Sequence, residues 1–225
     1  MNNLLDLKTI LEKYMSAIEV DRKSIVLNNN SIEDQENTMY CDIFPGVILA
    51  FLRFNSNFYI EDKINNSNVL EISYCIKGRF ECEINNRVIY VSEGDLSVNH
   101  IGHIQSESLF PLKIYEGISI YIDIKKFEGE LQEILKVLSV NVKGISEKLR
   151  LNNEYYICKA TSKIKRIFSE IYENRFDVSY IRIKFFELIY SLKFLSNKDF
   201  NHDRYYPKEQ VNKIKYIRNH MVEHD

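Results

Sequence analysis

The spacing of hydrophobic positions changes along the chain and divides it into three parts. Apolar side chains recur every three or four residues between positions 4 and 19, which predicts a helix with one buried face. Residues 28–38 are polar and rich in Asn, and we expect a loop there. From about residue 44 to residue 124 the pattern becomes that of β-strands, and beyond it the helical spacing returns.

The central part contains short segments rich in β-branched and aromatic residues, separated by turn-forming residues. The predicted strands are 47–54, 57–62, 69–76, 79–84, 87–91, 95–99 and 113–124. Turns are predicted at 65–68, Lys77-Gly78, Asn85-Asn86 and Glu93-Gly94. Several short strands at this spacing are typical of a sandwich or a barrel.

The two strands on either side of Gly78 are expected to pair as a hairpin in which Ile76 faces Phe80. This register gathers the apolar side chains of both strands on one side, and a slip by one residue would bring glutamates among them. It also places Cys75 and Cys82 on opposite faces, which excludes a disulfide bond between them.

The C-terminal part has helical periodicity at 128–139, 155–173 and 179–197. The last of these segments is apolar on two faces, so both faces need something to pack against. One face has heptad spacing, and we predict that it forms a dimer interface: Ile181, Phe185, Leu188, Leu192 and Leu195. The other face carries Ile183, Phe186, Tyr190 and Phe194. The alternative is a helix enclosed entirely within the monomer.

A last segment follows the polar stretch 197–206. Pro207 stands where the first turn of a helix favours proline, and Val211, Ile214, Ile217 and Met221 form an apolar face. Few residues remain to cover this face, so we expect a helix that opens a further, truncated domain.

Composition narrows the class of protein only slightly. Residues 156–225 carry 14 Lys and Arg against 9 Asp and Glu, an excess that a solvated helix face explains as well as nucleic-acid binding does. The N-terminus lacks the apolar run of a signal peptide, and no stretch of 18 apolar residues occurs. We therefore expect a cytoplasmic protein. The 4 cysteines form no C-x-x-C pair and are expected to be small buried side chains.

The sequence offers little for catalysis. It contains none of the common nucleotide-binding, hydrolase or metalloprotease motifs. His100 and His103 lie three residues apart without a neighbouring carboxylate or cysteine, so we interpret them as polar turn residues. We predict no catalytic residues.

Residues 70–103 resemble the cupin superfamily. Glu71 and Gly78 match the E-x6-G end of its first motif, and Gly94-Asp95 matches the turn into the second. Metal-binding cupins have H-x-H shortly before the glutamate, where this chain has Ile64-Asn65-Asn66-Ser67. Gln105 stands where the second motif has its histidine. The resemblance therefore implies a barrel for which we expect no metal and no cofactor. A stand-alone cupin enzyme, an isomerase or oxygenase, is kept as an alternative.

The order of the segments 70–84, 91–103, 110–123 and 211–225 resembles the regulatory half of AraC/XylS-family transcription regulators. In the last segment Ile214, Ile217, Arg218 and His220 match the first helix of that family's DNA-binding domain. The resemblance implies an α+β fold: a cupin-like antiparallel β-barrel or jelly roll, then a C-terminal helical region that forms a homodimer. DNA would be contacted only through the C-terminal DNA-binding domain missing from this chain.

On this basis we divide the chain into an N-terminal helix and arm (1–40), a cupin-like sensing barrel (41–127), a helical dimerisation region (128–200) and a linker with the first helix of a helix-turn-helix domain (201–225). Alternation along the strands suggests walls for an effector pocket: Phe51, Ile72, Tyr74, Cys82 and Tyr90. Arg53 and Arg79 are the expected partners of a carboxylate effector. Alternatively, side chains fill the barrel, a partner protein replaces the effector, or the chain is a protein-binding module that uses helix 179–197 without any DNA-binding domain.

Overall fold

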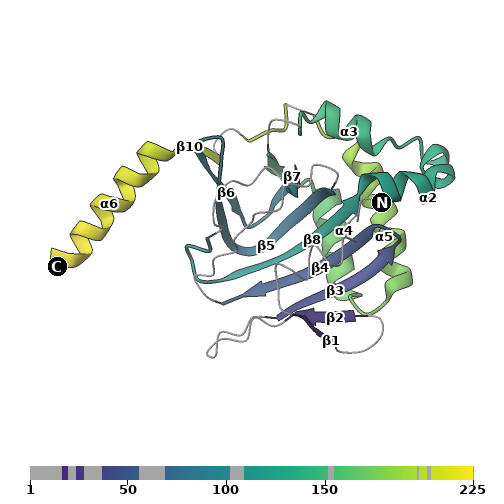
Figure 1. Cartoon of the computed structure of the whole chain (residues 1–225), viewed down its shortest axis with the longest axis horizontal. Helices are drawn as coiled ribbons and strands as arrows, with labels where there is room; N and C mark the ends of the chain where they lie inside the picture. Colours follow the sequence, from purple (N-terminus) through teal and green to yellow (C-terminus); the bar gives the residue numbers. More distant parts are fainter. Residues whose placement is uncertain are drawn as a thin grey trace, which may run out of the picture.

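The computed structural model describes residues 17–19, 24–27, 37–55, 69–101, 109–151, 155–196, 198–201 and 204–224. An antiparallel β-structure comes first and a mostly helical region follows, so the predicted α+β fold is confirmed (Figure 1). The strands before the helices are β1 (Ala17–Glu19), β2 (Ser24–Leu27), β3 (Asn37–Phe44), β4 (Val47–Phe54), β5 (Val69–Ile84), β6 (Arg87–Ser92), β7 (Asp95–His100) and β8 (Tyr115–Asp123). The predicted helix 4–19 lies outside the described residues except for its end, where Ala17–Glu19 form β1.

Two further strands, β9 (Tyr156–Lys159) and β10 (Tyr205–Pro207), occur later in the chain. The strands are joined in the order β1-β2-β3-β4-β8-β5-β6-β10, and β7 pairs with both β5 and β9. The first half of β5 lies between β8 and β7, and its second half pairs with β6. The predicted turn at Asn85-Asn86 closes the hairpin to β6, with φ angles of 49° and 61° that suit a two-residue hairpin turn.

The expected hairpin around Gly78 is absent, because residues 69–84 form the single strand β5. Pairing with β8 continues past a bulge between Cys75 and Lys77 up to Gly78. The bulge inserts one residue and reverses which face the following side chains occupy. Cys75 and Cys82 therefore lie in the same hydrophobic cluster rather than on opposite faces, although both are free thiols.

The helices are α2 (Ile124–Val137), α3 (Val142–Lys148), α4 (Ser162–Glu173), α5 (Val178–Leu192) and α6 (Lys208–His224). The first four each begin after a residue whose side-chain oxygen accepts a hydrogen bond from a backbone N–H of the first turn: Asp123, Asn141, Thr161 and Asp177. The predicted helix 155–173 starts too early, since Tyr156–Lys159 form strand β9 against β7. The cap at Thr161 explains why helical structure begins only after it.

The main hydrophobic core lies between one face of the sheet and the helices. Phe51, Ile72 and Ile120 point from the strands to this side, where they meet Ile167 and Phe185 of α4 and α5. The opposite face of the sheet is covered by the second half of β5 and by β6, with Cys82, Ile89 and Phe110 in a second cluster. We call the space between these two β-layers the barrel interior.

The chain leaves the helical region through β10 (Tyr205–Pro207), which adds to the free edge of β6. Helix α6 follows directly and projects away from the rest of the molecule (Figure 1). Val211 is buried at its base, whereas Ile214, Ile217 and Met221 are exposed. Among the described residues, no helix combines the length and the hydrophobicity needed to cross a bilayer.

Candidate functional site

A groove of about 310 Å³ opens where the helix-covered face of the sheet meets the C-terminal end of α4. Strands β3, β4, β5 and β8 supply one side, and residues at and just after the end of α4 supply the other. Its lining consists of Thr38, Met39, Phe51, Leu52, Arg53, Ile76, Glu116, Gly117, Tyr172 and Arg175. Most of the wall is apolar or aromatic, and the charged groups are two arginines and one glutamate.

The two arginines are held differently. Arg53 Nε lies 3.6 Å from Glu116 Oε1 of the neighbouring strand, and most of its side chain remains exposed. Arg175 Nη1 donates a hydrogen bond of 3.2 Å to the Tyr172 carbonyl, and its guanidinium lies over the rings of Tyr172 and Phe176. Stacking of this kind fixes the plane of a guanidinium while leaving its other N–H groups available to an acceptor.

The residues predicted to form one pocket lie in four places. Phe51 and Arg53 line the groove. Ile72 and Tyr74 pack beneath the helices, where the Tyr74 ring stacks on Phe168 with centroids 4.9 Å apart. The remaining three are elsewhere on β5 and β6. Cys82 lies in the barrel interior, whereas Arg79 lies over the ring of Tyr90, which also contacts Tyr206 of β10. Alternation along a strand identified the groove side of β4 but could not show that α4 ends there.

A polar centre lies in the barrel interior around Glu71 on β5. Ser73 Oγ donates to Glu71 Oε1 at 3.0 Å, and Asn99 Nδ2 of β7 donates to Oε2 at 3.3 Å. Ser73 and Ser119 share a 2.7 Å hydrogen bond. Burial raises the pKa of the Glu71 carboxyl, and hydrogen bonds from Ser73, Asn99, Tyr121 and Ser119 partly offset this rise. Glu71, noted in the sequence only for its place in a motif, is thus the centre of a hydrogen-bonded polar cluster.

The histidines do not form a metal site in the described part of the chain. His100 is buried at the end of β7, and its Nε2 lies 2.8 Å from Ser146 Oγ of α3. His103 and Gln105 lie outside the described residues. Within those residues, no group of three or more His, Cys, Asp or Glu side chains is arranged to hold a metal ion. The cysteines are buried as predicted, and burial raises the pKa of Cys158 to about 11 and that of Cys75 to about 12.

The heptad stripe of α5 occupies a different position from the one expected. Ile181, Phe185 and Leu188 are fully buried, as are Leu192 and Leu195, and all five belong to the monomer core. This face is therefore enclosed within the monomer, which was the alternative to a dimer interface. The second face is partly open: Ile183 is 65% exposed, Phe194 67% and Tyr190 38%. Heptad spacing alone cannot distinguish a seam between two chains from one within a chain.

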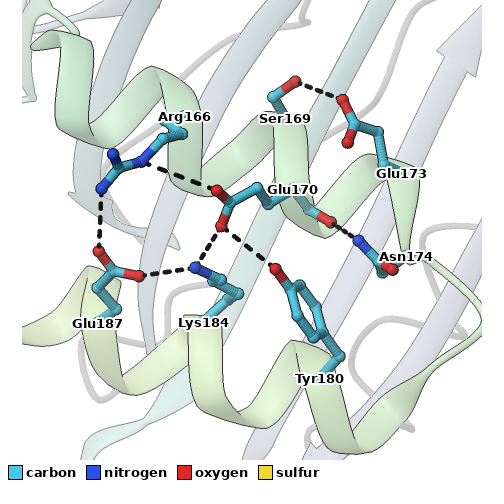
Figure 2. Close-up of polar contacts among 8 residues, drawn as sticks. All are labelled: Arg166, Ser169, Glu170, Glu173, Asn174, Tyr180, Lys184 and Glu187. Carbon is cyan, nitrogen blue, oxygen red and sulfur yellow. Dashed lines mark hydrogen bonds and ion pairs between the residues drawn. The ribbon is translucent and has the colours of Figure 1, made fainter.

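An ion-pair network ties α4 to α5 on their outer surface (Figure 2). Lys184 of α5 bridges Glu170 of α4 and Glu187 of its own helix. Arg166 lies near both carboxylates, 3.8 Å from Glu170 and 3.9 Å from Glu187. The hydrogen bonds that Lys184 donates to Glu170 and Glu187 raise the pKa of Lys184, and the one to Glu170 lowers the pKa of that carboxyl. The network therefore links the outer surfaces of the two helices.

No protein-family model matches the sequence, and no curated protein sequence matches it. Similar solved structures include the AraC-like transcriptional activator CuxR, at 10% identity and a TM-score of 0.47, covering 85% of this chain and 69% of CuxR. ToxT from Vibrio cholerae O395, bound to (E)-4-(8-methylnaphthalen-1-yl)but-3-enoic acid, matches 66% of this chain and 57% of its own at 14% identity and a TM-score of 0.42.

A cupin 2 conserved barrel domain protein from Salinispora arenicola CNS-205 matches 50% of this chain and 95% of its own, at 12% identity and a TM-score of 0.35. Structural neighbours thus include AraC-like regulators and cupin-barrel proteins. At these identities and TM-scores the similarity concerns the fold, and it assigns neither a family nor a function to this chain.

Proposed function

We propose that this chain is the effector-sensing and dimerising part of an AraC-type transcription regulator. A small molecule binds in the groove, and two copies associate through α5. Helix α6 is then the first helix of the adjoining DNA-binding domain that the sequence resemblance implies, and DNA is contacted only through that domain. Residues 41–127 serve as the sensing barrel and 128–200 as the dimerisation region, with α2 spanning their boundary.

The location of the groove carries this proposal. Phe51 and Ile76 belong to the sheet, whereas Tyr172 and Arg175 belong to the end of α4. A ligand in the groove touches both, so its affinity depends on how α4 sits against the sheet. A ligand shifts a conformational equilibrium only by its different affinities for the two states. The groove supplies such a difference, and the network between Lys184, Glu170 and Glu187 passes it to α5.

The lining favours an amphipathic anion. Met39, Phe51 and Ile76 offer apolar surface to a hydrocarbon or aromatic body. Arg53 and Arg175 offer guanidinium groups, whose planar donor pairs match a carboxylate. Glu116 pairs with Arg53, so one of the two arginines is already partly neutralised. A single negative charge is therefore better matched than two.

For the dimer, the outer face of α5 replaces the heptad stripe as the proposed interface. Ile183 and Phe194 expose most of their surface, and Tyr190 lies between Lys163 and Lys193, which approach its ring. Exposed apolar and aromatic side chains along a helix and just after its end, where Phe194 lies, are typical of an interface core, and the flanking charges are typical of a polar rim.

Isothermal titration with sodium octanoate and with 1-octanol tests the groove, because the two probes share an alkyl chain and differ in charge. We expect octanoate to bind and octanol to bind at least tenfold more weakly. Arg175→Gln should abolish this preference, whereas Arg87→Gln, an exposed arginine on β6, should leave it unchanged. Equal binding of both probes, or an unchanged preference in Arg175→Gln, contradicts an anion site in the groove.

A cupin enzyme remains the second candidate because Glu71, which matches the motif glutamate, lies in the barrel interior and is surrounded by partly buried polar side chains. Native mass spectrometry of the purified protein separates the two. A dimer without metal supports the regulator. A monomer with one transition metal per chain supports the enzyme.

A further inference from the structure

The segment that leads from α5 into α6 is joined to the barrel by three ion pairs. Arg204 Nε lies 2.9 Å from Asp95 Oδ2, and Lys208 Nζ lies 2.8 Å from Glu83. Lys215, two turns further along α6, pairs with Glu81. All three carboxylates belong to the barrel, and all three cations belong to residues 204–215, so the charges on the two sides are complementary.

The first of these pairs is a fixed anchor. Asp95 is fully buried and also pairs with Lys159 at 2.8 Å. Its Oδ2 accepts a hydrogen bond from the backbone N–H of Ser92, and Arg204 Nη2 donates to Oδ1 at 3.2 Å. Beside it, β10 pairs with β6, and Tyr205 packs into the second hydrophobic cluster. The chain is therefore held firmly up to the start of α6.

The pairs on α6 itself are of another kind. Lys208 and Lys215 are 42% and 38% exposed, so water and salt reach both. Their partners are rigid: Glu81 is almost fully buried, and its backbone exchanges two 2.8 Å hydrogen bonds with Leu109. Ion pairs that are partly exposed weaken as salt screens them. The Debye screening length falls from about 10 Å at 0.1 M salt to about 3 Å at 1 M.

Beyond its base, α6 extends into solvent (Figure 1). Val211 is buried, but Ile214, Ile217 and Met221 are not. Lys208 and Lys215 lie seven residues apart, which places both on the same face of the helix, toward β5. The contacts that hold α6 against the barrel thus include two charged points, a small apolar contact at Val211 and a 3.3 Å hydrogen bond from the Lys208 backbone N–H to the Asn86 carbonyl.

We propose that Glu81 and Glu83 form an electrostatic latch that sets the direction of α6, and that the latch opens when its charges are screened or competed for. The anchor at Asp95 and the pairing of β10 with β6 keep the base of the helix in place. Opening therefore changes the angle of α6 rather than detaching it. The latch needs no effector, so its test is independent of the groove.

The test measures the distance between α6 and the body of the protein by electron–electron double resonance. Spin labels are placed at Met221→Cys on α6 and Lys125→Cys on α2, both exposed positions, while the native cysteines are buried. We expect one narrow distance distribution at 0.1 M NaCl. In Lys208→Gln/Lys215→Gln the width of this distribution should at least double. In the protein with both lysines intact, 1 M NaCl should broaden the distribution in the same way.

Lys213→Gln is the matched control, because Lys213 lies on the same helix but pairs with Glu209 one turn away. It should keep the narrow distribution. As a second readout, amide exchange across residues 204–215 should be about two- to tenfold faster in the double variant, as expected for loss of two partly exposed ion pairs. A double variant as narrow and as slow to exchange as Lys213→Gln overturns the latch.

Discussion

Gly78 lies so close to the carbonyl oxygen of Ile114 that a Cβ atom at position 78 would stand 2.0 Å from that oxygen. Its φ of +90° adds a backbone conformation that other residues rarely adopt. The contact occurs just after the bulge, where β5 leaves β8 and turns toward β6. The bend of β5 therefore depends on glycine for two separate reasons.

Gly78→Ala should destabilise the protein by about 3 kcal/mol or more, because strain at positive φ and a clash with backbone add together. Gly94→Ala is the matched control: its φ is +77°, but the nearest atoms to a new Cβ are 3.8 Å away, at the end of a lysine side chain. It should cost about 1 kcal/mol. Urea unfolding of both variants measures the difference, and equal losses would show that the clash at Ile114 is relieved.

Leu188→Glu and Ile183→Glu separate the two faces of α5. Leu188 is fully buried, so a charge there should cost about 3–5 kcal/mol and prevent stable folding. Ile183 is 65% exposed, so Ile183→Glu should fold normally and convert a dimer to a monomer in light scattering. A folded, dimeric Ile183→Glu would place the interface elsewhere.

Glu71→Gln should gain stability relative to the wild type as the pH rises. The folded-state pKa of Glu71 is raised above its ordinary value of 4.5, so the fold favours the protonated carboxyl. The stability that the protonated Glu71 carboxyl contributes to the wild type is fully present below pH 4.5 and is lost as the pH rises through the folded-state pKa. Glutamine stays neutral throughout.

The difference in melting temperature between Glu71→Gln and wild type should be about 2–4 °C more favourable to the variant at pH 7.5 than at pH 4. Glu93→Gln, at an exposed turn, serves as the control and should show no such trend. A difference that is the same at both pH values would mean that the four donors around Glu71 fully balance the effect of burial on its pKa, and a trend in the opposite direction would mean that they outweigh it.

Asp95→Asn should lower the free energy of unfolding by about 3 kcal/mol, since it leaves Arg204 without the charge that neutralises it in a largely buried position. Lys159→Gln removes the other partner of Asp95, but that side chain is 55% exposed and its loss should cost less than about 1 kcal/mol. Chemical denaturation distinguishes them, and a larger loss for Lys159→Gln would identify Lys159 as the main partner.

The parts of the fold that depend on local patterns could be predicted from the sequence, and those that depend on distant partners could not. The Asn85-Asn86 turn is specified by its own residues. Lys77-Gly78 suits a hairpin turn and a bulge equally well, and pairing with β8 decides between them. The groove needs Arg175 to meet Phe51, and nothing in either segment indicates that they meet.

The course of β5 has a mechanical consequence. Ile76 lines the groove, while Glu81 and Glu83, further along the same strand, hold α6. Because these residues lie on one continuous strand, we expect a movement of the strand at Ile76 that is not taken up by a bend at Gly78 to displace both glutamates. The groove and α6 are thus connected through one strand, and the resistance of that strand to bending at Gly78 sets how far a movement in the groove reaches α6.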